Sequence, residues 1–305
     1  MITTIFKKST PINYSLVVIL LLSFFFLYQF NDAKPSDLHT NSIQTLGLLA
    51  SLFISNFIVK NNVLTKDSCY TLLFFLLFLL FFPSLFKNTN LIVAGFFILL
   101  AMRRLVSLQT LKAPKEKIFD ASLWIFVASM FHFWALLFIL LVYISIFFHV
   151  SRDYRNWLLP FVAFFATLVI FISYALLFDK VIIGSYLENA RVNFEIDYFT
   201  NIFQNLSLSI FTVFAVFFVF SSVFSLTSKP LNLQASYKKL IFAIIIGIAI
   251  FIFSPNKSSD ILVFTFFPLA VMATNTIEYS QYKLRNEIIL GASIVASFFC
   301  FFSQL

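Results

Sequence analysis

Long apolar runs alternate with short polar connections along the whole 305-residue chain. A helix that crosses the roughly 30 Å hydrocarbon core of a bilayer needs about 20 predominantly apolar residues. Runs near this length cover residues 12–30, 42–59, 69–86, 90–105, 119–150, 157–178, 203–224, 240–253, 261–276 and 288–302. The pattern predicts an all-α, polytopic integral membrane protein in which residues 1–305 form a single transmembrane helical domain.

The run 119–150 is the one segment whose length does not match a single crossing. At 1.5 Å per residue it would form about 48 Å of helix, which is long for one crossing and short for two. It is interrupted at His132, which is either a ligand or proton-handling group at a re-entrant tip or simply the residue where the helix breaks. A broken hairpin of two short helices here brings the expected number of membrane elements to ten or eleven.

The distribution of Lys and Arg favours this hairpin. Cytoplasmic loops of membrane proteins carry an excess of both residues. If the run 119–150 returns to its own side, 16 of the 21 basic residues lie on the cytoplasmic side and 5 outside; with a single crossing the division is 12 and 9. The composition, rich in Phe, Ile, Asn and Lys with only five Gly, suits an AT-rich bacterial genome, so the expected location is a bacterial inner membrane. The charges predict a cytoplasmic N-terminus. They place the connection 179–201 outside, where its aromatic and aliphatic residues suit an interfacial helix.

Composition excludes several classes of protein. The chain is 61% hydrophobic and 11% charged, and it contains 46 Phe, so too few polar groups remain to cover a soluble fold. The net charge of +8 is spread between the apolar runs rather than gathered on one face, which argues against nucleic acid as a partner. Cys69 and Cys300 offer neither a disulfide framework nor a metal-ligand spacing, and no cofactor-binding motif is present.

Two groups of polar residues are candidates for chemistry. Asp32 and Asp37 lie in the first outside loop, where paired carboxylates act as a general base or hold a divalent cation, or simply keep the loop soluble. Arg103, Arg104 and Lys112 lie at the end of the run 90–105 and just after it. Such a basic cluster either anchors the helix on the cytoplasmic side or binds the phosphate of a lipid.

Four segments resemble known membrane proteins. Residues 5–13 (IFKKSTPIN), 90–105 (NLIVAGFFILLAMRRL) and 118–131 (IFDASLWIFVASMF) resemble an uncharacterised family of multi-pass inner-membrane proteins from gliding-type Gram-negative bacteria. The split helix pair and residues 257–268 (KSSDILVFTFFP) are similar in layout to the transmembrane module of C-type glycosyltransferases. That second resemblance implies a polyprenyl-phosphate-linked sugar as donor, with Asp32 and Asp37 in the position of the catalytic acids.

The departures from the glycosyltransferase layout are also clear. The first outside loop has about eleven residues, whereas these enzymes have a long loop with interfacial helices, and the chain lacks a large outside domain. Since a shared fold does not fix a function, three interpretations stay open. The chain is a non-catalytic subunit or lipid-binding scaffold of a cell-envelope complex, with membrane lipids and membrane proteins as partners. Alternatively, it is a glycosyltransferase-like enzyme that uses a polyprenyl-phosphate sugar, or a small-molecule or lipid transporter.

Overall fold

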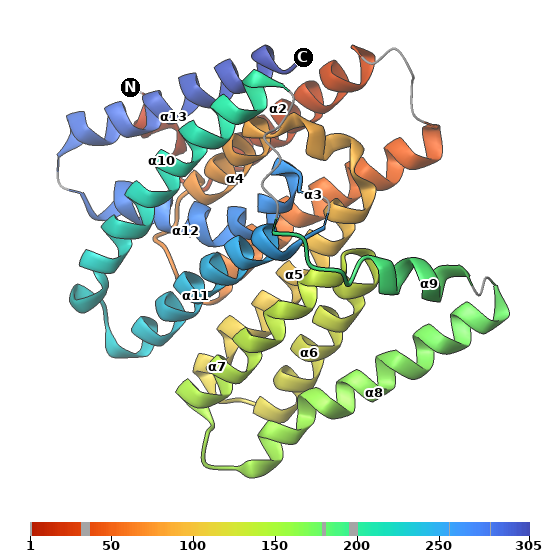
Figure 1. The fold of residues 1–305 in the computed structure, drawn as a ribbon. Helices are drawn as coiled ribbons and strands as arrows, with labels where there is room; N and C mark the ends of the chain where they lie inside the picture. Colours follow the sequence, from red (N-terminus) through yellow and green to blue (C-terminus); the bar gives the residue numbers. More distant parts are fainter. Residues whose placement is uncertain (1, 32–36, 179–180, 195–200, 256, 281) are drawn as a thin grey trace. The chain divides into compact units, whose positions relative to one another are not determined.

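The computed structural model of the chain describes residues 2–31, 37–178, 181–194, 201–255, 257–280 and 282–305. Within these ranges the regular structure is helical, and eight helices are long and apolar enough to cross a membrane. Two shorter apolar helices, Tyr70–Phe81 and Phe133–His149, add to this set. The prediction of an all-α, polytopic membrane protein is confirmed (Figure 1).

The helices form two compact units that interleave along the sequence. Unit 1 comprises Met1–Ile92, Tyr198–Lys229 and Thr265–Leu305, and unit 2 comprises Val93–Asp197 and Pro230–Phe264. Unit 1 holds α1 (Ile2–Phe6), α2 (Pro11–Phe30), α3 (Leu38–Asn61), α4 (Tyr70–Phe81), η1 (Pro83–Lys87), α10 (Ile202–Phe224), η4 (Leu226–Ser228), most of α12 (Val263–Tyr279) and α13 (Lys283–Ser303). Unit 2 holds most of α5 (Thr89–Ser107), η2 (Leu108–Thr110), α6 (Pro114–Phe131), η3 (Phe133–Phe138), α7 (Ile139–His149), α8 (Tyr154–Leu177), α9 (Val181–Glu188), α11 (Leu231–Phe253) and η5 (Ser259–Leu262). The expectation of a single domain stays a prediction.

Proline fixes where several of these helices begin. Pro11, Pro83 and Pro114 stand in the first turns of α2, η1 and α6. Proline suits this position because its fixed φ is helical and a first-turn N–H has no partner within the helix anyway. At α2 the preceding residue, Thr10, adds a side-chain cap, since its Oγ1 accepts a hydrogen bond from the N–H of Asn13.

The centre of unit 1 is packed with phenylalanine. Every residue of α4 is buried, and this helix contacts α2, α3, α10 and α13. Phe82 at its end stacks on Phe266 of α12 with ring centroids 6.1 Å apart, and Phe211 of α10 lies 5.8 Å from Phe266. Aromatic pairs at such distances stabilise a core beyond their buried area. Unit 1 therefore has an aromatic interior around α4 and α12.

The interrupted run 119–150 forms a hairpin within unit 2. α6 ends at Phe131, His132 turns the chain with extended backbone angles, and η3 and α7 return to pack against α6. α6 begins at Pro114, five residues before the predicted start, so its 18 residues span about 27 Å. Each arm of the hairpin is thus close to the length of one membrane crossing. The apolar run alone was too short for two crossings because it leaves out the first five residues of α6.

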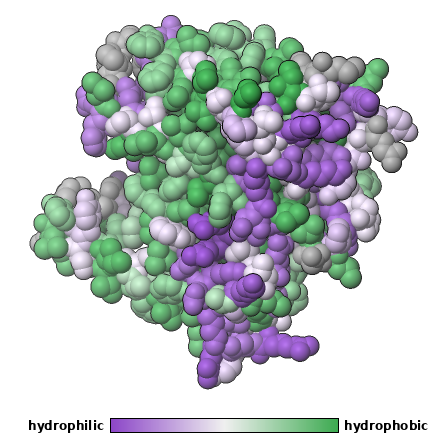
Figure 2. Space-filling model, turned by 180° about the vertical axis from the view of Figure 1, so that it is seen from behind, coloured by the Kyte–Doolittle hydropathy of each residue, from purple (hydrophilic) through white to green (hydrophobic). Residues whose placement is uncertain are grey.

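Large apolar side chains cover much of the surface. Only 22% of the most apolar stretch of α8 is buried within the protein, and the same share applies to α10. Phe161, Phe165 and Ile170 of α8 are more than half exposed, as are Val213 and Phe220 of α10. The face drawn in Figure 2 is correspondingly hydrophobic over most of its area, with hydrophilic residues gathered in patches. In a membrane these faces meet lipid or other proteins.

Candidate functional site: an apolar pocket and a basic end in unit 2

Of the two carboxylates that sequence analysis pairs as catalytic acids, the structure describes only Asp37. Asp37 is exposed and immediately precedes α3, and its side chain makes no capping hydrogen bond. Asp32 lies outside the described residues. Their proposed joint role as catalytic acids therefore stays a prediction.

Nine basic residues of unit 2 lie in four parts of the sequence, most of them at or near the ends of its helices. They are Arg103, Arg104, Lys112, Lys115, Lys117, Arg152, Arg155, Lys238 and Lys239. Arg104 pairs with Asp120 at 2.8 Å, and Lys115 pairs with Asp153 at 3.2 Å, which ties the start of α6 to the start of α8. All nine are residues that the sequence assigns to the cytoplasmic side, so the structure brings together charges that the topology expects together.

The three predicted lipid-phosphate ligands have different surroundings. Arg104 is partly neutralised by Asp120, Arg103 is half-buried, and the side chain of Lys112 is exposed. The backbone N–H of Arg155 and the ammonium of Lys115 hold the pKa of Asp153 below its usual range, so this neighbouring acid stays ionised. The local excess of positive charge at this end suits an anionic lipid head group. Binding itself stays a prediction.

Lys239 is a buried cation that the sequence did not single out. It lies in α11, its side chain has no exposed surface, and its Nζ donates to the carbonyl oxygen of Leu105 at 2.6 Å. Leu105 is in the last turn of α5, where carbonyls lack partners within the helix and the helix dipole favours a cation. Lys239 therefore caps α5 from a neighbouring helix and fixes α11 to the basic end of unit 2.

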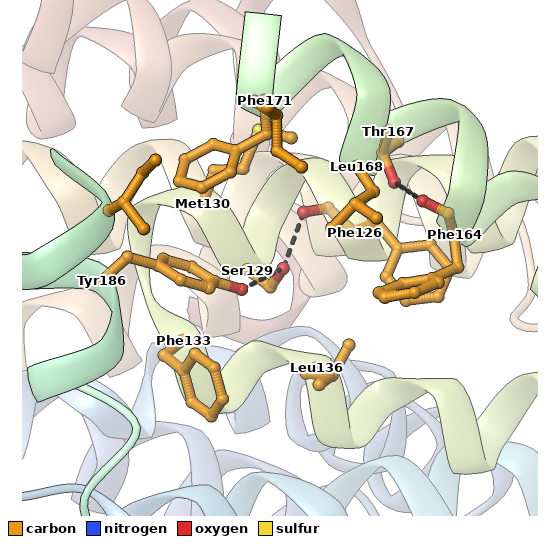
Figure 3. Close-up of a pocket in the computed structure, with 12 residues that line it drawn as sticks. Phe126, Ser129, Met130, Phe133, Leu136, Phe164, Thr167, Leu168, Phe171 and Tyr186 are labelled. Atoms are coloured by element: carbon orange, nitrogen blue, oxygen red, sulfur yellow. Dashed lines mark hydrogen bonds between the residues drawn. The ribbon is translucent and has the colours of Figure 1, made fainter. Parts of the chain in front are cut away.

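A pocket of about 450 Å³ opens at the other end of α6. It lies between α6, η3, α8 and α9 (Figure 3), and its walls are apolar apart from three hydroxyl groups. The lining residues are Phe126, Ser129, Met130, Phe133, Leu136, Phe164, Thr167, Leu168, Phe171, Ile172, Ile183 and Tyr186. Cavities of this size and character are typical of sites that bury an apolar ligand.

The hydroxyl groups of the pocket are held by the protein itself. Ser129 Oγ donates to the carbonyl of Phe126 at 2.7 Å and lies 3.4 Å from the hydroxyl of Tyr186. Thr167 Oγ1 lies 2.9 Å from the carbonyl of Phe164, within its own helix (Figure 3). Because these groups already have partners, they add little polarity to the pocket, and its interior is suited to a hydrocarbon chain.

Tyr186 closes one side of the pocket from the segment predicted to carry an interfacial helix. α9 forms within the connection 179–201, while its interfacial position stays a prediction, and the ring of Tyr186 lies 5.1 Å from those of both Phe133 and Phe171. Sequence analysis found α9 but not the pocket. Ser129 and Tyr186 are 57 residues apart, and nothing in the hydropathy pattern shows which faces of α6, α8 and α9 meet.

A second buried cation lies in unit 1. The side chain of Lys229, between η4 and α11, is 6% exposed, and its Nζ donates to Asn275 Oδ1 at 3.2 Å. The same Nζ lies 4.3 Å from the ring centre of Tyr279. Burial lowers the pKa of Lys229 to about 8, while the nearby carboxylate of Glu278 opposes this shift. An amide, an aromatic face and a carboxylate thus partly compensate for the loss of water around this lysine.

Comparison with known proteins adds a family but no activity. The model of DUF6427, a family of unknown function, matches residues 1–305. The chain belongs to this family. The match agrees with the expectation of a family without an assigned activity, and the helices agree with a multi-pass membrane protein. No curated protein and no solved structure matches the chain.

Proposed function

We propose that this DUF6427 member is a non-catalytic, lipid-binding subunit of a bacterial inner-membrane complex, and that the apolar pocket of unit 2 holds a hydrocarbon chain of a membrane lipid. The pocket is the observation that carries the proposal. Its walls come from helices with bilayer-facing surfaces, and only lipid or protein is abundant around such surfaces. The occupied pocket would fill about 450 Å³ that otherwise lacks packing contacts.

The charges of unit 2 support the same proposal. α6 and α8 start together at the basic end, where Lys115 and Asp153 meet, and both helices run from there to the pocket. About 18 Å of helix separates Lys117 from Ser129 along α6. A lipid whose phosphate lies beside Arg104 and Lys112 would therefore place its chain along the α6–α8 face that leads to the pocket.

Cross-linking of a lipid tests the pocket directly. The full chain, in nanodiscs that contain a phospholipid with a diazirine at the end of one acyl chain, should form adducts with pocket residues on illumination. Met130→Trp fills the pocket and should reduce these adducts at least fivefold. Phe165→Trp, on the exposed side of α8, is the matched control and should leave them unchanged. Equal labelling of both variants would show that the lipid merely surrounds the protein.

Purification tests the proposed membership of a complex. The exposed faces of α8 and α10 offer apolar area to partner helices, as a subunit of a membrane complex requires. Mild-detergent purification from native membranes should recover membrane proteins in stoichiometric amounts together with lipid. Recovery of the chain alone, at full yield and with lipid bound, would agree with the lipid-binding proposal but contradict the proposal that the chain is a subunit of a complex.

A glycosyltransferase-like enzyme is the second candidate. It is favoured by the exposed carboxylate of Asp37 at the start of α3, because a catalytic acid must reach its substrate. In that case, Asp32→Asn and Asp37→Asn would each abolish sugar transfer from a polyprenyl-phosphate donor while the protein still inserts into the membrane. The subunit proposal expects both variants to support normal assembly of the complex.

A further inference from the structure

A polar cavity of about 490 Å³ lies in unit 1, distinct from the apolar pocket of unit 2. α1, the connection between α3 and α4, the end of α12 and the start of α13 converge on it. Its polar lining comprises Thr3, Thr4, Lys7, Lys66, Ser68, Tyr70, Glu278, Ser280, Lys283, Asn286 and Glu287. The volume is ample for a small polar ligand.

The surrounding chain holds Glu278 firmly in this cavity. One carboxylate oxygen accepts a hydrogen bond from the backbone N–H of Lys66 at 2.8 Å, and the other accepts one from Ser68 Oγ. Lys66 Nζ returns to the backbone carbonyl of Glu278 at 3.1 Å. Each carboxylate oxygen can accept a second hydrogen bond, so Glu278 is oriented and still able to receive a donor.

Two neighbouring polar atoms are buried without a hydrogen-bond partner among the described residues. They are Asn286 Oδ1 and Ser280 Oγ. The amide nitrogen of Asn286 donates to the carbonyls of Ile277 and Ser280 at 3.0 and 3.4 Å, which settles which atom of this amide is the oxygen. A buried acceptor without a partner costs about 1–3 kcal/mol, and a ligand with several N–H donors would relieve that cost.

Apart from Glu278, three lysines and one further carboxylate line the cavity. They are Lys7, Lys66 and Lys283, and Glu287, which accepts hydrogen bonds from the backbone N–H and the hydroxyl of Thr3. Lys7, just after α1, and Lys283 of α13 make no ion pair with a described residue. Lys283 also opens α13, whose dipole favours an anion at this end. A simple anion would meet the carboxylate of Glu278, and a simple cation would meet the lysines. A ligand with both charges matches both sides.

We infer that this cavity is a binding site for a phosphoethanolamine group, with the ammonium at Glu278 and Asn286 Oδ1 and the phosphate at Lys7 and Lys283. The same chemistry occurs as the head group of a phospholipid and as the free soluble ester. A phosphate is favoured over a carboxylate because two lysines and a helix N-terminus face one group, and a dianion or its ester offers more oxygens to share among them.

Thermal unfolding of the full chain in detergent, after its lipids have been exchanged away, tests the inference. Short-chain phosphatidylethanolamine and free phosphoethanolamine are the two probes, and the matching phosphocholine compounds are the controls because their quaternary nitrogen has no N–H. The ethanolamine compounds should raise the melting temperature at concentrations at least tenfold lower than the choline compounds. Stabilisation by the lipid form alone identifies a lipid head group, whereas equal stabilisation by the free ester identifies a soluble ligand.

Variants locate the two charges of the ligand. Lys283→Met, an exposed change that should leave the fold intact, should weaken binding of either ethanolamine probe about tenfold, and Glu278→Gln should remove the preference over choline. Arg285→Met, an exposed change on the same helix but outside the cavity lining, is the matched control and should bind as the wild type does. Equal binding of the ethanolamine and choline compounds, or wild-type affinity in Lys283→Met, would overturn the inference. Tighter binding of an amino acid would overturn the assignment of phosphate. The readout with free phosphoethanolamine does not depend on the lipid pocket of unit 2, because this probe has no hydrocarbon chain.

Discussion

α12 and α8 both belong to stretches that are long and apolar enough to cross a membrane, but their surroundings are opposite. Within the span that includes α12, 94% of the most apolar stretch is buried inside the protein, against 22% for α8. The buried helix is the less apolar of the two and carries Thr274, Asn275 and Thr276. Thr274 Oγ1 lies 3.1 Å from Thr71 Oγ1, and Thr276 Oγ1 donates to Ser221 Oγ at 3.2 Å.

The comparison shows what hydropathy measures in a membrane protein. Lipid tails are as apolar as a protein core, so a strongly apolar helix need not be a central one. Polar side chains are costly against lipid but stabilise contacts once a neighbouring helix supplies their partners. In α12 the lower apolar character accompanies burial, whereas α13 has the same mean hydropathy of 1.6 and is only 28% buried, so hydropathy alone does not indicate which helix is central. The first of four pairs of substitutions compares α12 with α8, and the other three test further enclosed or open positions.

The largest effect should come from the aromatic core around α12. Phe266→Ala removes a fully buried ring that packs against Phe82 and Phe211, and it should lower the free energy of unfolding in detergent by about 3–5 kcal/mol. Phe165→Ala on α8, where the ring is 60% exposed, should change it by less than about 0.5 kcal/mol. Similar losses in the two variants would contradict the comparison.

Sequence reasoning predicted the helices better than their surroundings. The run 203–224 became α10 (Ile202–Phe224), because its apolar length and its Asn201 cap are both local features. α6 starts earlier than predicted, at Pro114, and the lysines that follow have partners from elsewhere: Lys115 pairs with Asp153, and Lys117 donates to the carbonyl of Ser107. Apolar length alone cannot show that a charged first turn is stabilised by a distant residue.

The candidate sites were harder to predict for the same reason. Sequence analysis did not single out Glu278, because its hydrogen bonds to Lys66 and Ser68 cross more than 200 positions. The pocket of unit 2 depends on how three helices pack, and all three are apolar on most faces. The basic end could be anticipated because charge is visible in the sequence and topology sorts it to one side.

The second-largest effect is expected at Lys229, the buried lysine whose Nζ lies beside Asn275 and Tyr279 of α12. Lys229 has a pKa of about 8 in the fold and 10.5 in the unfolded chain, so its ionised form destabilises the fold fully below about pH 8. This cost should shrink as the pH rises toward 10.5. Over that range the free energy of unfolding of the wild type should rise by up to about 3 kcal/mol relative to that of Lys229→Met. Denaturant titrations at pH 7 and pH 10.5 measure the gain. Lys238→Met, an exposed change, should show no such difference.

A smaller effect on stability is expected at two glycines of unit 1, of which Gly47 lies at a helix contact and Gly291 on an open helix face. A Cβ on Gly47 of α3 would lie 2.7 Å from Cγ2 of Ile92, and a β-branched side chain has little freedom to move away. Gly47→Ala should therefore cost about 1–3 kcal/mol. A Cβ on Gly291 of α13 meets nothing within 4 Å, so Gly291→Ala should gain up to about 1 kcal/mol from helix propensity. Thermal melts of the two variants should move in opposite directions.

The smallest effect is expected at the basic end of unit 2, where charges are solvated rather than enclosed. Arg104 and Asp120 form a 2.8 Å ion pair, but their side chains remain 39% and 33% exposed. A double-mutant cycle with Arg104→Gln and Asp120→Asn should give a coupling of about 0.2–1 kcal/mol, falling as salt shortens the Debye length. A coupling above about 2 kcal/mol that resists salt would place this pair in an enclosed site. In that case the positive charge available to a lipid phosphate would come from Lys112 rather than from Arg104.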